Sequence, residues 1–326
     1  MTAKGQPIAD FGFCVRGMYF SGTGTTEKIV TAVAEVISRA LDGEQPASDA
    51  SMDLNIYRVP DYDFTPPAAR KKEYHFGPRD IVVFGVPVIA GRVPNVLLPF
   101  LKTLDGGGAI AVPVVLYGNR NFDDALIELR NILEEQGFHT IAGAAFIGEH
   151  SFSRILAAGR PDDADIEVAV DFGKDVAEKI ASLCRKAAQK LAEQSDGDAG
   201  ETVDGMEAFA PVLAEACPVE VDGEDPIRPY YIPQDRQGNH INILKVKPKV
   251  DASKCTRCGI CISACPMGSI HWTDEAVTVE GICIKCCGCE KKCPEGVFYF
   301  DDEGYLYHKT ELELGYPDRK EPKLFL

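Results

Sequence analysis

Long apolar runs are absent from this 326-residue sequence, and no stretch approaches the roughly 18–20 consecutive apolar residues that a membrane helix needs. The opening residues, Met-Thr-Ala-Lys-Gly-Gln-Pro, also lack the charged-then-apolar pattern of a secretory leader. These absences predict a protein that does not insert into a membrane and that works in the cytoplasm.

Basic residues are in short supply. The chain has 34 Lys and Arg against 50 Asp and Glu, which gives a formal net charge of −16. A nucleic-acid binder needs a basic surface to displace counterions, so that function class is excluded. An acidic protein suits a redox partner protein with a basic docking patch, because complementary fields speed the encounter of the two.

Cysteine, by contrast, is abundant, with twelve in the chain. Nine of the twelve lie between positions 255 and 293, so they mark a domain of distinct composition. In a chain of this length without a secretory leader, such a cluster indicates metal or redox chemistry rather than a disulfide scaffold.

Strand and helix patterns alternate through residues 1–195. Short apolar segments predict strands, and apolar residues spaced three and four apart predict helices. Alternating strands and helices favour an α/β fold in which a doubly wound, five-stranded parallel sheet is covered on both faces. The predicted strands are 11–20, 54–59, 81–86, 109–116 and 139–147, and the main predicted helices are 93–104, 122–136 and 165–194.

Residues 196–245 have the composition of a linker. Ten acidic residues and no basic one occur between positions 196 and 227, and Gly and Pro are interleaved with them. Over 196–227 this pattern predicts a solvated tether with one short helix at 206–216. Residues 228–250 are rich in Pro and Tyr and are expected to pack on one of the two domains. Residues 303–326 form a C-terminal extension whose role the sequence leaves open.

Two copies of the pattern C-x-x-C-x-x-C-x-x-x-C-P lie within residues 246–302, and each cysteine of the second copy follows its counterpart by 28 positions. In such runs three closely spaced thiolates hold one cubane, while the fourth cysteine ligates the other cluster. One [4Fe-4S] cluster is therefore predicted on Cys255, Cys258, Cys261 and Cys293, and a second on Cys283, Cys286, Cys289 and Cys265.

This segment resembles the bacterial two-[4Fe-4S] ferredoxins, which implies a small α+β domain. The alternative is a zinc site, which usually takes four ligands from paired C-x-x-C units without the Cys-Pro end. Cys287 departs from the repeat and is interpreted either as a small buried side chain or as a substitute ligand during cluster rearrangement. Cys14, Cys184 and Cys217 are interpreted as unreactive thiols.

Near the N-terminus, a loop rich in glycine and hydroxyl groups joins the first predicted strand to a helix. Its amides, its hydroxyls and the helix dipole favour a phosphate dianion. The loop matches neither G-x-G-x-x-G nor the Walker pattern, which suggests a mononucleotide, although an ordinary helix cap is the alternative. The predicted phosphate ligands are Ser21, Gly22, Thr23, Gly24, Thr25 and Thr26.

In this context the segment resembles the flavodoxin family, whose S-G-T-G-x-T loop binds FMN. The resemblance implies that the flavin ring lies beside the loops after the third and fourth strands. Tyr117 or Phe122 is expected to flank the ring, with backbone groups nearby bonding its polar edge. The implied ring contacts are Pro87, Val88, Ile89, Ala90 and Gly91 in the first loop, and Tyr117, Gly118, Asn119, Arg120 and Phe122 in the second.

His150 follows the fifth predicted strand at the same edge of the sheet. It is the one candidate catalytic residue, as a proton donor beside the flavin, and a structural role is the alternative.

The order of the two parts resembles the flavodoxin–ferredoxin fusion proteins of anaerobes. The main hypothesis is a redox protein that moves electrons between FMN and two [4Fe-4S] clusters and links a low-potential donor or acceptor to a partner enzyme. The alternatives are a flavin-dependent reductase of quinone, nitro or azo compounds, and a redox-sensing module. The oligomeric state is open, with a dimer among the options.

Overall fold

A computed structural model describes residues 8–43, 52–53, 56–194 and 202–326. Its largest sheet has the order β15-β9-β7-β6-β2-β4, and β5 also pairs with β2. All neighbours are parallel except β15. The strands are β2 (Cys14–Tyr19), β4 (Tyr57–Arg58), β5 (Tyr62–Asp63), β6 (Asp80–Pro87), β7 (Ile110–Tyr117), β8 (His139–Thr140), β9 (Gly143–Ile147) and β15 (Lys323–Phe325).

Helices cover both faces of this sheet because the strands are apolar on both faces. Along β7, Ile110, Val112 and Val114 pack on the side of α1 and α4, while Ala111 and Val115 pack on the side of α2 and α3. The helices are α1 (Thr25–Gly43), α2 (Leu98–Leu101), α3 (Ala125–Glu135) and α4 (Asp163–Gln194). Counting β4 and β5 as one position, the parallel strands follow the order 2-1-3-4-5, so this is the flavodoxin-like doubly wound fold. Its switch point lies between β2 and β6.

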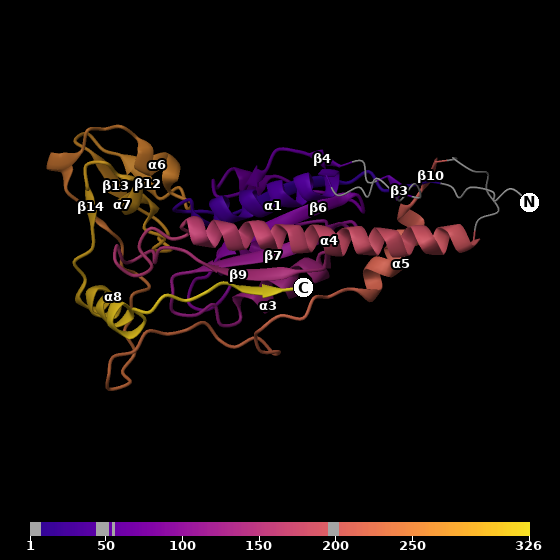
Figure 1. Ribbon diagram of the computed structural model, residues 1–326. Coiled ribbons are helices and arrows are strands. Elements are labelled where there is room, and N and C mark those ends of the chain that lie inside the picture. The colour runs from indigo at the N-terminus through magenta and orange to yellow at the C-terminus, as the bar shows by residue number, and fades with distance from the viewer. Residues whose placement is uncertain (1–7, 44–51, 54–55, 195–201) are drawn as a thin grey trace, which may run out of the picture.

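The cysteine-rich segment forms a second, smaller unit beyond one end of the large sheet (Figure 1). Two antiparallel pairs and two short helices build it, together with the 3-10 turn η2 (Ala252–Lys254). The pairs are β11 (Lys249–Val250) with β14 (Phe298–Tyr299), and β12 (Ile270–Trp272) with β13 (Val277–Val279); the helices are α6 (Ile260–Ala264) and α7 (Gly288–Lys292).

Small elements complete the chain. A three-stranded parallel sheet lies at the other end of the molecule, near the N-terminus (Figure 1). It contains β1 (Ile8–Asp10), β3 (Met52–Asp53) and β10 (Thr202–Asp204). A 3-10 turn, η1 (Ala69–Lys71), precedes β6, and α8 (Glu303–Gly315) precedes β15.

Residues 202–227, predicted as part of a solvated tether, instead pack on the first domain. Residues 228–245 also contact this domain, in agreement with the packing expected from their Pro- and Tyr-rich sequence. Helix α5 (Met206–Glu215) buries Phe209 and Leu213 in the core beside α4. Residues 217–245, here named the strap, then run across the first domain, where Arg228 bonds the buried Asp124. Composition averaged over the segment concealed these few anchoring side chains. Residues 196–201 of the predicted linker lie outside the described residues.

The C-terminal extension packs on the large sheet. Strand β15 joins β9 in antiparallel register and adds a sixth position to the five predicted ones. Figure 1 shows this strand, in yellow, returning from the cysteine-rich unit to the large sheet.

Within the described part of the chain, no helix is both long and apolar enough to cross a membrane.

Candidate functional site

The loop after β2 is anchored by side-chain bonds at its start. The Ser21 amide donates to Thr65 Oγ1 at 2.7 Å, and Ser21 Oγ accepts the Glu27 amide of α1 at 3.1 Å. Gly24 has φ +97°, a conformation that favours glycine, and no neighbouring atom lies where its Cβ would be. The loop is therefore fixed at Ser21 and open around Gly24.

This loop also holds a set of free amides. In the described part of the chain, the N–H groups of residues 22–26 have no protein acceptor. They lie at the N-terminus of a 19-residue helix, whose dipole adds positive potential. The hydroxyls of Thr23 and Thr25 lie 3.4 Å apart beside them. Orphan amides around an open glycine fit a phosphate group, as the sequence predicted for this loop.

The first ring-side loop has most of its backbone groups engaged. The Val88 amide donates to Leu116 O at 2.7 Å, and Ile89 and Arg92 bond each other. Ala90 and Gly91 have positive φ, and the Ala90 carbonyl accepts the Tyr231 amide of the strap at 2.9 Å. The amides of Ala90 and Gly91 have no acceptor among the described residues and can bond a ligand. Tyr231 brings an aromatic side chain to a loop that has none of its own.

The second ring-side loop differs from the sequence expectation. Tyr117 and Phe122 are only 6% and 4% exposed, and their rings pack on each other within the core. Neither is therefore free to flank a flavin ring. Their burial follows from the tertiary packing of β7 against the α2–α3 side of the sheet, which the local sequence does not reveal.

Asn119 is also buried in this loop, at 2% exposed, but it carries an unpaired polar atom. The Asn119 amide nitrogen donates to the backbone carbonyls of Tyr316 and Asp318, while its Oδ1 is buried and has no partner among the described residues. An orphaned acceptor suits a ligand N–H group. The Arg120 guanidinium lies 4.4 Å from the centre of the Tyr231 ring and pairs with Asp123.

His150 packs against Gly118, and its Nδ1 accepts the Phe152 amide at 3.1 Å. Burial, with smaller contributions from the charges of Lys291, His308 and Arg120, lowers the pKa of His150 to about 3. The imidazole is therefore neutral at pH 7, with its proton on Nε2. It can donate a hydrogen bond, but it is not a reservoir of acid protons.

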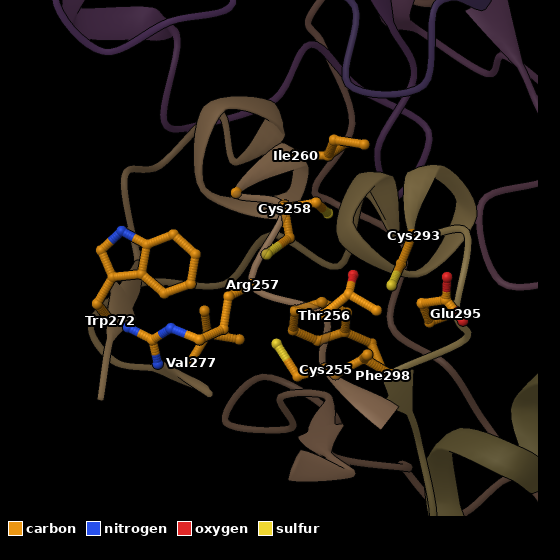
Figure 2. A pocket seen from close by; sticks show the side chains of 13 residues that line it. Cys255, Thr256, Arg257, Cys258, Ile260, Trp272, Val277, Cys293, Glu295 and Phe298 are labelled. Carbon is orange, nitrogen blue, oxygen red and sulfur yellow. The ribbon is translucent and has the colours of Figure 1, made fainter. Parts of the chain in front are cut away.

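The first cysteine-lined cavity opens to solvent and has a volume of about 330 Å³, including the open part. Its lining contains the four cysteines predicted for one cluster: Cys255, Cys258, Cys261 and Cys293. Figure 2 shows Cys255, Cys258 and Cys293 pointing toward one another; Cys255 and Cys258 lie in the loop before α6, and Cys293 directly follows α7. Trp272 lies at the rim with Arg257 stacked on its ring.

The second cavity, about 410 Å³, is lined by Cys265, Cys283, Cys286 and Cys289, together with Cys287. Each cavity thus takes three cysteines from one motif and the fourth from the other. Burial raises the pKa of the Cys261, Cys283, Cys286 and Cys289 thiols, in the case of Cys286 to about 11. Bound iron would offset this burial, because coordination deprotonates a thiol.

No group of three or more His, Cys, Asp or Glu side chains in the described ranges is placed to hold a single metal ion. The cysteines instead line two separate cavities, four motif cysteines to each, and four thiols around one cavity is the donor set of a cubane ligated at its corners.

The two parts of the site meet. A Cβ added to Gly22 of the phosphate loop would lie 3.1 Å from Cys286 Cβ, and one added to Gly288 would lie 2.6 Å from the Gly22 carbonyl oxygen. The second cysteine cavity therefore lies against the predicted phosphate site. Sequence reasoning missed this contact, and it also missed Thr65, Tyr231 and Lys291. Only the position of Lys291 inside the second motif could have signalled its role.

Known proteins similar to each of the two parts were found. Residues 248–271 match the Fer4 family, the 4Fe-4S binding domain. No match was found among curated proteins. A flavodoxin from the domain Archaea is 16% identical over 52% of this chain and 99% of its own, with a TM-score of 0.33.

Two further solved structures are similar to the N-terminal part. The two-electron reduced flavodoxin of Megasphaera elsdenii is 20% identical over 50% of this chain and 98% of its own, with a TM-score of 0.29. The apo form of an NADH:FMN oxidoreductase is 13% identical over 50% of this chain and 88% of its own, with a TM-score of 0.31. The chain thus joins a flavodoxin-like fold to a C-terminal 4Fe-4S binding segment, in the order of flavodoxin–ferredoxin fusions.

Proposed function

We propose that this protein is an internal electron conduit that carries FMN in its first domain and two [4Fe-4S] clusters in its second. The observation that carries the proposal is the contact between Gly22 of the phosphate loop and Cys286 of the second cysteine cavity. When bound, FMN exchanges one or two electrons and each cluster exchanges one. The flavodoxin-like fold and the Fer4 match support a redox protein of this kind.

The residues of the chain bind and shield these groups. The free amides of residues 22–26 would hold the phosphate of FMN. The amides of Ala90 and Gly91 and the Oδ1 of Asn119 would bond the polar edge of the ring. The eight motif cysteines would hold two clusters, in the two sets that line the cavities. Buried Ile270 and Phe298 help to exclude water from them.

The external partner in this proposal is a redox protein with a basic docking patch, which suits the net charge of −16. Two oxygen-sensitive clusters also suit a reducing, cytoplasmic setting.

An anaerobic redox titration of the purified protein, followed by visible and EPR spectroscopy, tests the cofactor content. We expect one FMN and two [4Fe-4S] clusters per chain. Rapid mixing with substoichiometric dithionite then tests transfer, and electrons should redistribute between clusters and flavin at a rate independent of protein concentration. Flavin and clusters that reduce independently would rule out the conduit.

The reductase alternative depends on chemistry at the flavin. The structure holds His150 as a neutral hydrogen-bond donor, which restricts that alternative to substrates that need no imidazolium acid. Turnover of quinone, nitro or azo compounds by the reduced protein, at a rate above that of free FMN, would favour it over the conduit.

A further inference from the structure

Lys291 connects the two domains by a compact set of bonds. It belongs to α7, between Cys289 and Cys293. Its ammonium group donates to Glu149 Oε1 at 2.6 Å, to the His150 carbonyl at 2.7 Å and to the Ser153 carbonyl at 3.0 Å. The side chain is 11% exposed, and Glu149 is 24% exposed. A lysine ammonium has three donors, so this group is fully satisfied by the loop after β9.

The other contacts of this junction come from the same side of the cysteine-rich unit. The Arg70 guanidinium donates to the Pro266 carbonyl beside Cys265. Arg154 donates to the Glu290 carbonyl at 3.1 Å. Ile284, which lines the second cavity, packs against the core on the α2–α3 side of the large sheet. All of these contacts hold the second cavity toward the predicted flavin.

The first cavity lies on the free side of this unit. In the described residues, the hydrogen bonds of its lining side chains stay within the unit, as when Arg257 donates to the carbonyls of Thr273 and Asp274. Cys258 is exposed, and Ile260 and Trp272 at the rim are 41% and 47% exposed. Figure 2 shows this rim around the cysteines.

We infer that the two cysteine cavities have fixed and different places, and that Lys291 is the positioning residue that sets them. The second cavity is the inner one, held against the phosphate loop, and the first is the outer one, whose Cys258 is exposed while the four motif cysteines of the second are not. The inference rests on the proposed function for its redox meaning. A low-potential reductant from outside the protein would give one electron to the cluster in the first cavity. The flavin would then receive one electron from the cluster in the second cavity.

The test compares Lys291→Met with Lys292→Met in the full-length holoprotein. Both variants remove one positive charge from α7, but Lys292 is exposed and makes no ion pair or side-chain hydrogen bond in the described structure. Iron, sulfide and flavin content should be unchanged in both. In Lys291→Met, flavin reduction after dithionite mixing should slow by about tenfold. Hydrogen bonds to a charged group, at their usual strength, change the equilibrium between docked and undocked domains by about that factor when they are lost.

A second readout needs no electron transfer. Hydrogen exchange at residues 149–153 should rise in Lys291→Met and stay at the wild-type level in Lys292→Met. If Lys291→Met fails to load its cofactors, Glu149→Gln serves as the milder variant, since it keeps the shape of the side chain and removes only its charge. A smaller slowing is expected there.

The outcomes separate the two proposals. Unchanged exchange and unchanged flavin reduction in Lys291→Met would overturn the positioning role while leaving the conduit intact. Absence of internal transfer in the wild-type protein would overturn the conduit, and the exchange measurement would still decide whether Lys291 holds the junction.

Discussion

Cys287 and Gly259 occupy equivalent positions in the two cysteine motifs, 28 residues apart. Both precede a short helix, and both have left-handed backbone conformations, with φ of 57° and 79°. A cysteine in this conformation is strained where glycine is not. The Cys287 thiol is buried, lies 3.6 Å from the Tyr305 hydroxyl and is 3.4 Å from the Lys285 carbonyl. Its surroundings therefore agree with a packing role beneath α8, and the substitute-ligand interpretation stays a prediction.

His150 leads to a prediction at the scale of one residue. Its pKa is about 3 in the folded protein against 6.5 when unfolded, so the unfolded chain binds the extra proton first as the pH falls. The neutral imidazole thus stabilises the fold above pH 6.5, and this stability is lost progressively from pH 6.5 down to about 3. Between pH 7 and 5.5 the loss from His150 should be about 1 kcal/mol.

Urea unfolding at pH 7 and pH 5.5 measures this loss. His150→Gln, which does not titrate, should show a pH dependence smaller by about that amount. His308, whose pKa burial lowers to about 4, remains in both proteins and cancels in the comparison. An identical pH dependence in the variant would show that His150 is not held neutral in the folded protein over this pH range.

The strap shows how one buried charge anchors a whole segment. The Asp124 carboxylate accepts two bonds from the Arg228 guanidinium and two from the Glu224 and Arg228 amides. Mainly because of its hydrogen bonds to Arg228, the pKa of Asp124 falls to about 2. The Asp124 side chain is 1% exposed, so its charge depends on this partner.

At the scale of the element, Arg228→Met should therefore destabilise the protein and lower its midpoint in urea, since it leaves the Asp124 carboxylate without its counterion. Arg236→Met is the matched control, because Arg236 pairs with Glu311 at the surface, and its midpoint in urea should stay close to that of the wild type. Adding Asp124→Asn to Arg228→Met should recover part of the loss. Equal midpoints in urea for the two single variants would contradict the anchoring role.

Strand β15 shows a different way to place a terminal segment. It pairs with β9 along the edge of the large sheet, and Phe325 packs against the core. An added antiparallel strand covers an edge that would otherwise expose unpaired backbone groups. On the way there, the segment passes the second ring-side loop, where the Tyr316 and Asp318 carbonyls accept from Asn119. The same segment thus closes the sheet and orients a predicted flavin contact.

The two domains differ in the size of their cores. The first has extensive apolar clusters on both faces of the sheet. The second buries few apolar side chains in its own cluster, and one of them is Cys261. Domains this small usually need a metal or disulfides to remain folded. The metal clusters are therefore expected to supply much of the stability of the second domain.

Removal of iron tests this expectation on the whole molecule. After oxidation and chelation, residues 249–299 should lose hydrogen-exchange protection, while β6, β7 and α4 keep theirs. Reconstitution with iron and sulfide should restore protection in the second domain. Persistent protection of the β12–β13 pair in iron-free protein would show that the second domain folds on its side chains alone.

Much of this molecule follows from local sequence. The alternation of apolar strands with helices led to the doubly wound sheet, since a strand buried on both faces must be apolar throughout. The cysteine repeat led to two sets of four thiols, because ligand spacing on a tight loop is a local property. The strand–loop–helix junction at 21–26 likewise predicted an anion site from residues adjacent in sequence.

Only the tertiary structure decided what depends on contacts between distant segments. The burial of Tyr117 and Phe122 and the neutral state of His150 depend on neighbours from other elements. The packing of the acidic segment depends on a few anchors, such as Arg228 on Asp124, which composition cannot reveal. The place of each cysteine cavity relative to the phosphate loop depends on Lys291 and on the loop after β9, which are about 140 residues apart. Local spacing determines which groups this protein can bind, and the packing of distant segments determines how those groups face one another.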